Sequence, residues 1–189
     1  MTYRFGEQFR VGAIGAQMLD GYFSKLYRLL PATMQEEENG IDRVGFKDDG
    51  SQVLIEYKTD VKADFTGRAF IEVVAYAHDR GQRDGWAQTS QADIIVYFLP
   101  FSNRLFLLRP RRLRARMALY EAQYERMHVK NPGWTTTGLL VPLEVLLIDR
   151  IAVLVSFKES QNDYCKHVAR TARECLRTDA ELHREASRN

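Results

Sequence analysis

The chain has few of the features that mark specialised protein classes. Its 189 residues include only two cysteines, Cys165 and Cys175, within a stretch that is predicted to be helical. The helical residues between them span about 15 Å, too far for a disulfide, so we expect reduced thiols and a cytoplasmic protein. The sequence has no run of about 18 apolar residues and no charged-then-apolar leader, so we expect neither a membrane span nor secretion.

Charge and small motifs exclude further classes. The formal net charge is only +2, so any nucleic-acid-binding surface must be local. The sequence contains no glycine-rich phosphate loop of the P-loop or dinucleotide type. Its four histidines are scattered and do not pair with cysteine at zinc-site spacing. An unrelated small-molecule enzyme therefore lacks support, and the composition, 45% hydrophobic and 28% charged, suits one globular domain.

The most informative stretch is residues 41–58, which predicts a β-hairpin. Two alternating runs flank a turn rich in Asp and Gly, the residues that a tight reversal needs. We expect Lys47 to pair with Ser51 around the three-residue loop Asp48-Asp49-Gly50, with Gly50 in the left-handed conformation. This register determines which side chains face each other further along the two strands.

In that register Asp42 lies opposite Glu56. Opposed like charges destabilise a strand pair, and a bound divalent cation is the most direct reason for keeping them. Lys58 projects from the same face as Glu56, so the hairpin is charged at its open end. The ordinary alternatives are that Asp42 caps a loop and that Glu56 and Lys58 form a surface ion pair on an edge strand. The same face is apolar near the turn, where it carries Val44, Phe46 and Leu54.

An Asp at the start of one strand, followed by Glu-x-Lys at the end of the next, resembles the PD-(D/E)XK nuclease superfamily. The resemblance covers roughly residues 5–100. A second triplet, Asp60-Val61-Lys62, follows closely, but an apolar strand leads into the first one and the hairpin supplies its partner acid. Ile41 stands where the family name has proline, a position that the family keeps loosely.

The resemblance implies an α/β fold with a central mixed sheet of four to five strands flanked by helices. A restriction-endonuclease-like core would occupy residues 1–160, and a C-terminal helix and tail, residues 161–189, would belong to the same domain or contact a second subunit in a homodimer. The implied activity is Mg- or Mn-dependent hydrolysis of DNA phosphodiester bonds, in particular by an endonuclease. The alternative is a non-catalytic nucleic-acid-binding or assembly module that keeps the fold, with fortuitous acids.

Site roles follow from the same resemblance. Asp42 and Glu56, with the Tyr57 carbonyl, would hold the metal, and Lys58 would position the attacking water. Members of the family often place a Glu from their first helix beside the metal, and Glu7 matches; otherwise Glu7 is a solvated residue that complements the helix dipole.

Other residues are weaker candidates. Glu72 is an acid inside an apolar strand, and it is either a site carboxylate or an arginine partner. Thr66 and Arg68 are candidates for phosphate contact. Residues 109–116 contain five arginines, whose forks match phosphate oxygens; the alternative is a helix surface paired with Glu121 and Glu125. The candidates for nucleic-acid binding in this stretch are Arg111, Arg112, Arg114 and Arg116.

Periodicity and turn residues predict the remaining elements. We expect a helix over 5–30, stopped by Pro31, and loops or polar connections over 31–40, 59–68, 77–91 and 128–138. We expect strands over 69–76, 92–98, 104–108 and 151–157, and helices from Pro110 to 126, from Pro142 to 148, and over 162–186.

Overall fold

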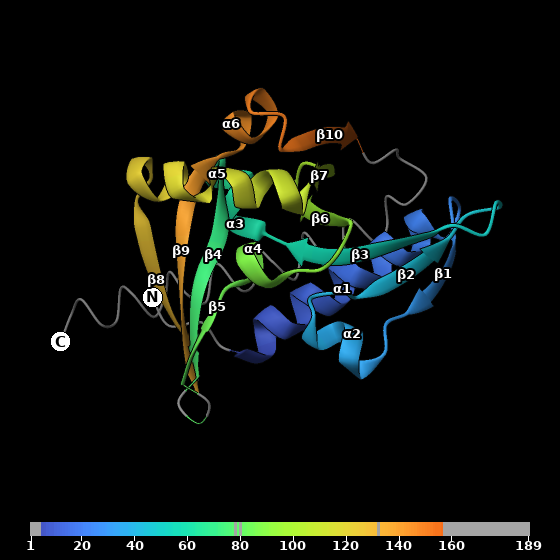
Figure 1. The fold of residues 1–189 in the computed structure, drawn as a ribbon, viewed down its shortest axis with the longest axis horizontal. Helices are drawn as coiled ribbons and strands as arrows, with labels where there is room; N and C mark the ends of the chain where they lie inside the picture. Colours follow the sequence, from blue (N-terminus) through green and yellow to red (C-terminus); the bar gives the residue numbers. More distant parts are fainter. Residues whose placement is uncertain (1–4, 78, 80, 132, 157–189) are drawn as a thin grey trace.

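The structure, a computed structural model, describes residues 5–77, 79, 81–131 and 133–156. These residues form two sheets and the helices that pack on them (Figure 1). The first is a mixed six-stranded sheet and the second is an antiparallel four-stranded sheet. In spatial order, the larger sheet contains β1 (Arg28–Pro31), β2 (Arg43–Phe46), β3 (Gln52–Thr59), β6 (Ile94–Leu99), β7 (Arg104–Leu108) and β10 (Ala152–Ser156). The smaller sheet contains β5 (Gly81–Asp84), β4 (Arg68–Ala77), β9 (Trp134–Pro142) and β8 (Arg126–Asn131).

The α/β class with a mixed sheet flanked by helices is confirmed. The larger sheet has six strands instead of the expected four to five, and the second sheet was not expected. The helices are α1 (Phe5–Phe23), α2 (Met34–Glu38), α3 (Val61–Thr66), α4 (Trp86–Thr89), α5 (Pro110–Gln123) and α6 (Leu143–Ile148). Among the described residues, no helix is both long and apolar enough to cross a membrane.

The predicted hairpin register is confirmed. The Lys47 N–H donates to the Ser51 carbonyl at 2.9 Å, and Gly50 has a φ of 80°, which glycine adopts without steric cost. The paired residues run from Phe46 opposite Gln52 to Arg43 opposite Ile55. Asp42 therefore lies directly before β2, at the open end of the hairpin.

Strand β3 is central, because it pairs with β2 on one edge and with β6, in parallel, on the other. One of its faces packs on α1, where Val53, Ile55 and Tyr57 join Met18, Leu19 and Phe23 in a buried cluster. Gly15 allows α1 to approach closely, since a Cβ there would lie 2.1 Å from the Thr59 Oγ1. Alternation along the strand places Glu56 and Lys58 on the face away from α1, where Leu54 packs with Val44 and Ile41.

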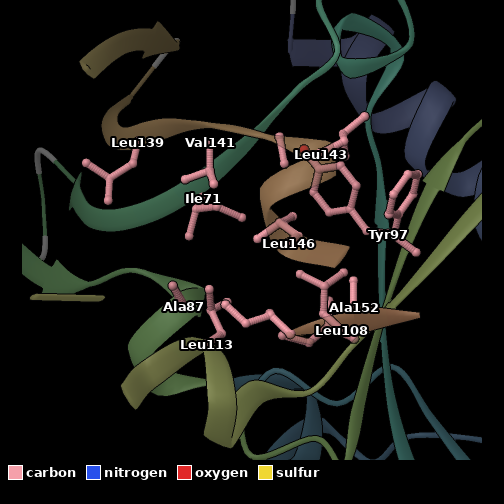
Figure 2. Close-up of a cluster of buried hydrophobic side chains, with 14 of the residues drawn as sticks. Ile71, Ala87, Tyr97, Leu108, Leu113, Leu139, Val141, Leu143, Leu146 and Ala152 are labelled. Carbon is pink, nitrogen blue, oxygen red and sulfur yellow. The ribbon is translucent and has the colours of Figure 1, made fainter. Parts of the chain in front are cut away.

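The largest core joins the two sheets. Side chains from β4 and β9 pack on α5 and α6, and β6 and β7 contribute from the larger sheet. Figure 2 shows Ile71, Leu139 and Val141 on one side of this core, with Leu113 and Leu146 from the two helices. This packing joins β4 to β6, the neighbour of β3, and the end of β3 points toward β4 in Figure 1, so the two sheets meet near the open end of the hairpin.

Two predictions at the N-terminal end are wrong. The helix expected over 5–30 ends at Phe23, and Arg28–Pro31 forms β1, which pairs antiparallel with β2. Pro31 is tolerated there because β1 is an edge strand. The loop expected over 31–40 contains α2, which a capping box of Thr33 and Glu36 begins. The pattern Thr-x-x-Glu is itself a sequence signal for the start of a helix.

Three further stretches that were predicted as loops or polar connections also contain helices or strands. The connection over 59–68 contains α3, with Asp60 as its N-cap and Gly67 as its left-handed C-cap. The loop over 77–91 contains β5 and α4, and the loop over 128–138 contains most of β8 and the start of β9. Strand β8 was not predicted: its exposed residues, Arg126, His128 and Lys130, are charged or polar, and the residues between them are only half-buried.

The remaining helices and strands predicted within the described residues are confirmed. The strands expected over 69–76, 92–98, 104–108 and 151–157 correspond to β4, β6, β7 and β10, within one or two residues of the expected bounds as far as residue 156. Helices begin at Pro110, as the first helical residue, and directly after Pro142, although α5 ends at Gln123 rather than at residue 126. The helix predicted over 162–186, with Cys165 and Cys175, lies outside the described residues.

Candidate active site

The open end of the hairpin brings Asp42 against the strand that carries Glu56 and Lys58. The ladder between β2 and β3 ends at Arg43. Beyond it, the Asp42 N–H donates to the Ile55 carbonyl at 2.8 Å, and the Asp42 Oδ2 accepts the Tyr57 N–H at 2.6 Å. The carboxylate thus replaces a strand partner, and this hydrogen bond fixes it beside the Glu-x-Lys triplet.

Glu56 is the buried acid of the group. The residue is only 2% exposed, and its Oε1 lies 2.6 Å from the Lys58 Nζ. Its Oε2 is buried and has no hydrogen-bond partner among the described residues. Burying a polar atom without a partner is costly, so this oxygen calls for an explanation.

The loop before β2 closes over the same oxygen. Gly40 has a φ of +71°, and a Cβ at this position would lie 3.3 Å from the Glu56 Oε2 and 3.2 Å from the Ser90 Cα. Glycine therefore serves two needs here, the left-handed backbone and the close approach. The sequence gives no sign of this role, because the contact joins segments far apart in the chain.

Lys58 lies among three acids. Burial alone would lower its pKa, but the charges of Glu56, Asp42 and Glu72 outweigh burial and raise the pKa above its ordinary value. The side chain is 33% exposed, and its Nζ lies 5.8 Å from the centre of the Trp86 ring, within reach of a cation–π interaction. Lys58 is therefore a charged ammonium group at neutral pH, partly open to solvent.

Glu72 reaches this group from the second sheet. Burial raises its pKa, and the Glu56 charge acts in the same direction, while Lys58 and the Trp86 N–H oppose the shift. The backbone N–H of Trp86 donates to the Glu72 Oε1 at 3.4 Å. Of the candidates that the sequence indicated only weakly, Glu72 is the one that the structure brings to Lys58.

The donor atoms fit a magnesium-like ion, although they do not form an all-protein cage. Among the described residues, no three His, Cys, Asp or Glu side chains are grouped to hold a metal ion. Magnesium usually takes one or two carboxylates and completes its shell with water and substrate phosphate. Asp42 and the unpartnered Glu56 oxygen supply the carboxylates. The N–H and C=O of one strand residue point to the same edge, so the Tyr57 carbonyl is directed past the end of β2, toward Asp42.

Other predicted residues lie elsewhere or outside the description. Glu7 lies in α1, but its side chain is not among those described. The hydrogen bonds of Thr66 are to the Lys62 carbonyl and to the backbone of Arg68, within the α3–β4 connection. The second triplet is structural, because Asp60 caps α3 and accepts a hydrogen bond from the Tyr97 hydroxyl.

Three of the four candidate arginines of α5 contact other groups of the protein, and the fourth, Arg111, is exposed. Arg114 donates to the Ser90 carbonyl at 2.9 Å, so it contacts the segment that packs on Gly40. Arg112 donates to the Arg150 carbonyl at 3.3 Å, and the Arg116 Nε lies 3.9 Å from Asp149. Arg111 is exposed. Glu121, one of the expected partners, instead pairs with Arg126 at 3.0 Å.

In comparisons with known proteins, no family model matches the sequence, and searches of curated proteins and of solved structures give no match. The interpretation of the site therefore depends on its own geometry and chemistry.

Proposed function

We propose that this protein is a divalent-metal-dependent nuclease that hydrolyses DNA phosphodiester bonds. One observation carries the proposal: Glu56 is a buried carboxylate with one oxygen on Lys58 and the other without a described partner, beside a second fixed carboxylate, Asp42. A carboxylate that serves only the fold would be expected to satisfy both oxygens. A cation ligand keeps one available.

The arrangement also supports the finer assignment to the PD-(D/E)XK, restriction-endonuclease-like group. That resemblance implies a mixed sheet flanked by helices, with the acids and the lysine at the open end of a hairpin. The hairpin formed by β2 and β3 has the register that this requires, and its charged end faces away from α1. Support for the assignment comes from this geometry and from the Asp, Glu-x-Lys pattern.

A magnesium or manganese ion would be held by Asp42, Glu56 and the Tyr57 carbonyl. When bound, such an ion supplies positive charge for the phosphate oxygens and lowers the pKa of a bound water. Asp42 is oriented for this task by the Tyr57 N–H. Lys58 keeps its proton, since its pKa is raised by the neighbouring acids against the effect of burial. Its ammonium can donate three hydrogen bonds, enough to hold the attacking water and to stabilise charge that develops on the phosphate.

DNA is the proposed partner because the arginine-rich helix lies on the same side of the fold as the loop over Glu56. Arg114 contacts Ser90 in that loop region. Arg111 is exposed and lies within two helical turns of Arg112, Arg114 and Arg116 on α5. Arginine forks suit the phosphate backbone, which supplies most of the affinity for DNA. An endonuclease that cuts both strands of a duplex would need a second site, which a homodimer supplies.

Calorimetric titration with Mn²⁺ tests the site itself. Wild type should bind the ion, Glu56→Ala should bind it at least about tenfold more weakly, and Glu37→Gln, at an exposed glutamate on α2, should match wild type. Metal binding unchanged in Glu56→Ala would remove the proposed site. A wild type that neither binds metal nor cleaves any nucleic acid would favour the non-catalytic binding or assembly module.

A further inference from the structure

The strand that carries Glu72 is irregular at that residue. Glu72 pairs with Gly138 and Val74 pairs with Thr137, so Val73 is an extra residue and β4 has a bulge. Bulges occur next to active sites, where they redirect a side chain. Gly138, the partner of Glu72 on β9, adds no side chain beside it.

The segment before α4 is also shaped around Glu72. A Cβ at Gly85 would lie 2.5 Å from the Glu72 carbonyl group and 2.8 Å from the Glu72 Cγ, so only glycine fits without a shift. The Gly85 N–H donates to the Val73 carbonyl at 2.8 Å, which anchors this close approach on the bulge residue. Trp86 then joins the two charged groups: its N–H is 3.4 Å from the Glu72 Oε1, and its ring is 5.8 Å from the Lys58 Nζ.

In the proposed metal site, Lys58 needs a second acidic partner in addition to Glu56. Lys58 is held at 2.6 Å by the Glu56 Oε1, and a cation bound by Glu56 would repel the ammonium group. A partly buried lysine that loses its counter-ion either turns into solvent or finds another acid. Asp42 cannot serve, because it is the second ligand of the same ion. Glu72 remains.

We propose that Glu72 is a positioning residue that holds the Lys58 ammonium group in the site when Glu56 binds the metal. This inference rests on the proposed function. In this state the ammonium group lies nearer to Glu72 and Trp86, and the bulge at Val73 and the close approach at Gly85 fix the positions of these two residues. Lys58 then stays beside the attacking water instead of turning outward, so the effect of Glu72 on the reaction passes through Lys58.

A double-mutant cycle on metal affinity separates this role from direct coordination. The four proteins are wild type, Glu72→Gln, Lys58→Met and the double variant, and the measurement is the calorimetric Kd for Mn²⁺. Glu72→Gln keeps a side-chain oxygen that can accept the hydrogen bond from the backbone N–H of Trp86. We expect it to weaken Mn²⁺ binding about five- to tenfold with Lys58 present, and to change it less than about twofold with Lys58→Met, as for residues that act through one another. Equal weakening in both backgrounds would make Glu72 a ligand or a remote charge and would overturn the inference.

Kinetics give a second test that does not need Lys58→Met to fold. Glu72→Gln should lower kcat for plasmid cleavage about 10- to 100-fold, the size of effect expected when a catalytic group is misplaced, with KM for DNA within about threefold of wild type. Glu72→Asp, which restores the charge, should recover part of kcat. A purely structural role predicts a lower unfolding midpoint for Glu72→Gln and no rescue by Asp. If wild type binds metal and cleaves DNA, and Glu72→Gln has the same kcat and metal affinity, only the inference about Glu72 is wrong. If wild type neither binds metal nor cleaves DNA, both the proposed function and this inference are wrong.

Discussion

The ion pair between Glu56 and Lys58 should respond very differently to removal of its two members. The Glu56 side chain is 3% exposed and the Lys58 side chain is 33% exposed, at an Nζ–Oε1 distance of 2.6 Å. Lys58→Met leaves a buried carboxylate with no cation in contact. Glu56→Gln leaves an ammonium group that reaches solvent and still has Asp42 and Glu72 nearby. In the metal-free protein, the lysine substitution should therefore be far more damaging.

The difference can be estimated from these burial values. Removing one partner so that a buried charge is left uncompensated costs about 3–5 kcal/mol of unfolding free energy. For a domain of this size each kcal/mol shifts Tm by about 2–4 °C, so Lys58→Met should lower Tm by roughly 6–20 °C. Glu56→Gln replaces a charge by an amide that is easier to bury, and it should cost about 1 kcal/mol.

Thermal and urea unfolding, followed by far-ultraviolet circular dichroism with EDTA at neutral pH, measures both variants. Lys47→Met is the control, because Lys47 is an exposed lysine of the same hairpin, and it should stay within about 0.5 kcal/mol of wild type. If Lys58→Met proved as stable as Glu56→Gln, Glu56 would not be a buried charge that depends on Lys58, and the reasoning about the site would be wrong.

Three other outcomes are expected. Burial raises the pKa of Glu72 in the folded protein, so the contribution of this carboxyl group to stability is greatest below the ordinary pKa of a glutamate and is lost as the pH rises through the raised pKa. In metal-free unfolding, the stability of Glu72→Gln relative to wild type should therefore increase as the pH rises above the ordinary glutamate pKa, and a pH-independent difference would contradict this. Gly12→Ala should stabilise α1 by about 0.5–1 kcal/mol, because nothing lies within 4 Å of the added Cβ. Gly15→Ala should instead destabilise the protein by about 1–3 kcal/mol, because its Cβ would lie 2.1 Å from the Thr59 hydroxyl oxygen on β3. Equal effects of the two substitutions on Tm would contradict the packing of α1 on β3. Arg111→Ala with Arg112→Ala should weaken duplex binding and flatten its salt dependence by about two charges, measured by fluorescence anisotropy, and an unchanged slope would place DNA elsewhere.

The hairpin could be predicted in detail because its signals are local. Turn length, the glycine at residue 50 and alternation in two adjacent runs determine the register, and the register placed Asp42 beside the strand of Glu56 and Lys58. Strand β6 was equally clear, since a continuous apolar run indicates burial on both faces.

The contribution of the second sheet to the site could not be predicted, because it depends on long-range packing. Strand β8 has three exposed polar residues that alternate with half-buried ones, and its pairing with β9 determines its structure more than its local preference does. Glu72 was visible as an acid in an apolar strand, but its approach to Lys58 depends on the bulge at Val73 and on Gly85, neither of which has a sequence signature. The same holds for Gly40 over Glu56.

Cleavage of supercoiled plasmid and of single-stranded DNA, by wild type and by Glu56→Gln, tests the central claim most directly. The account predicts cleavage by wild type that requires Mg²⁺ or Mn²⁺ and stops with EDTA, and loss of cleavage and of metal binding in a Glu56→Gln protein that remains folded. Cleavage that persists in folded Glu56→Gln, or that continues without any divalent ion, would contradict it.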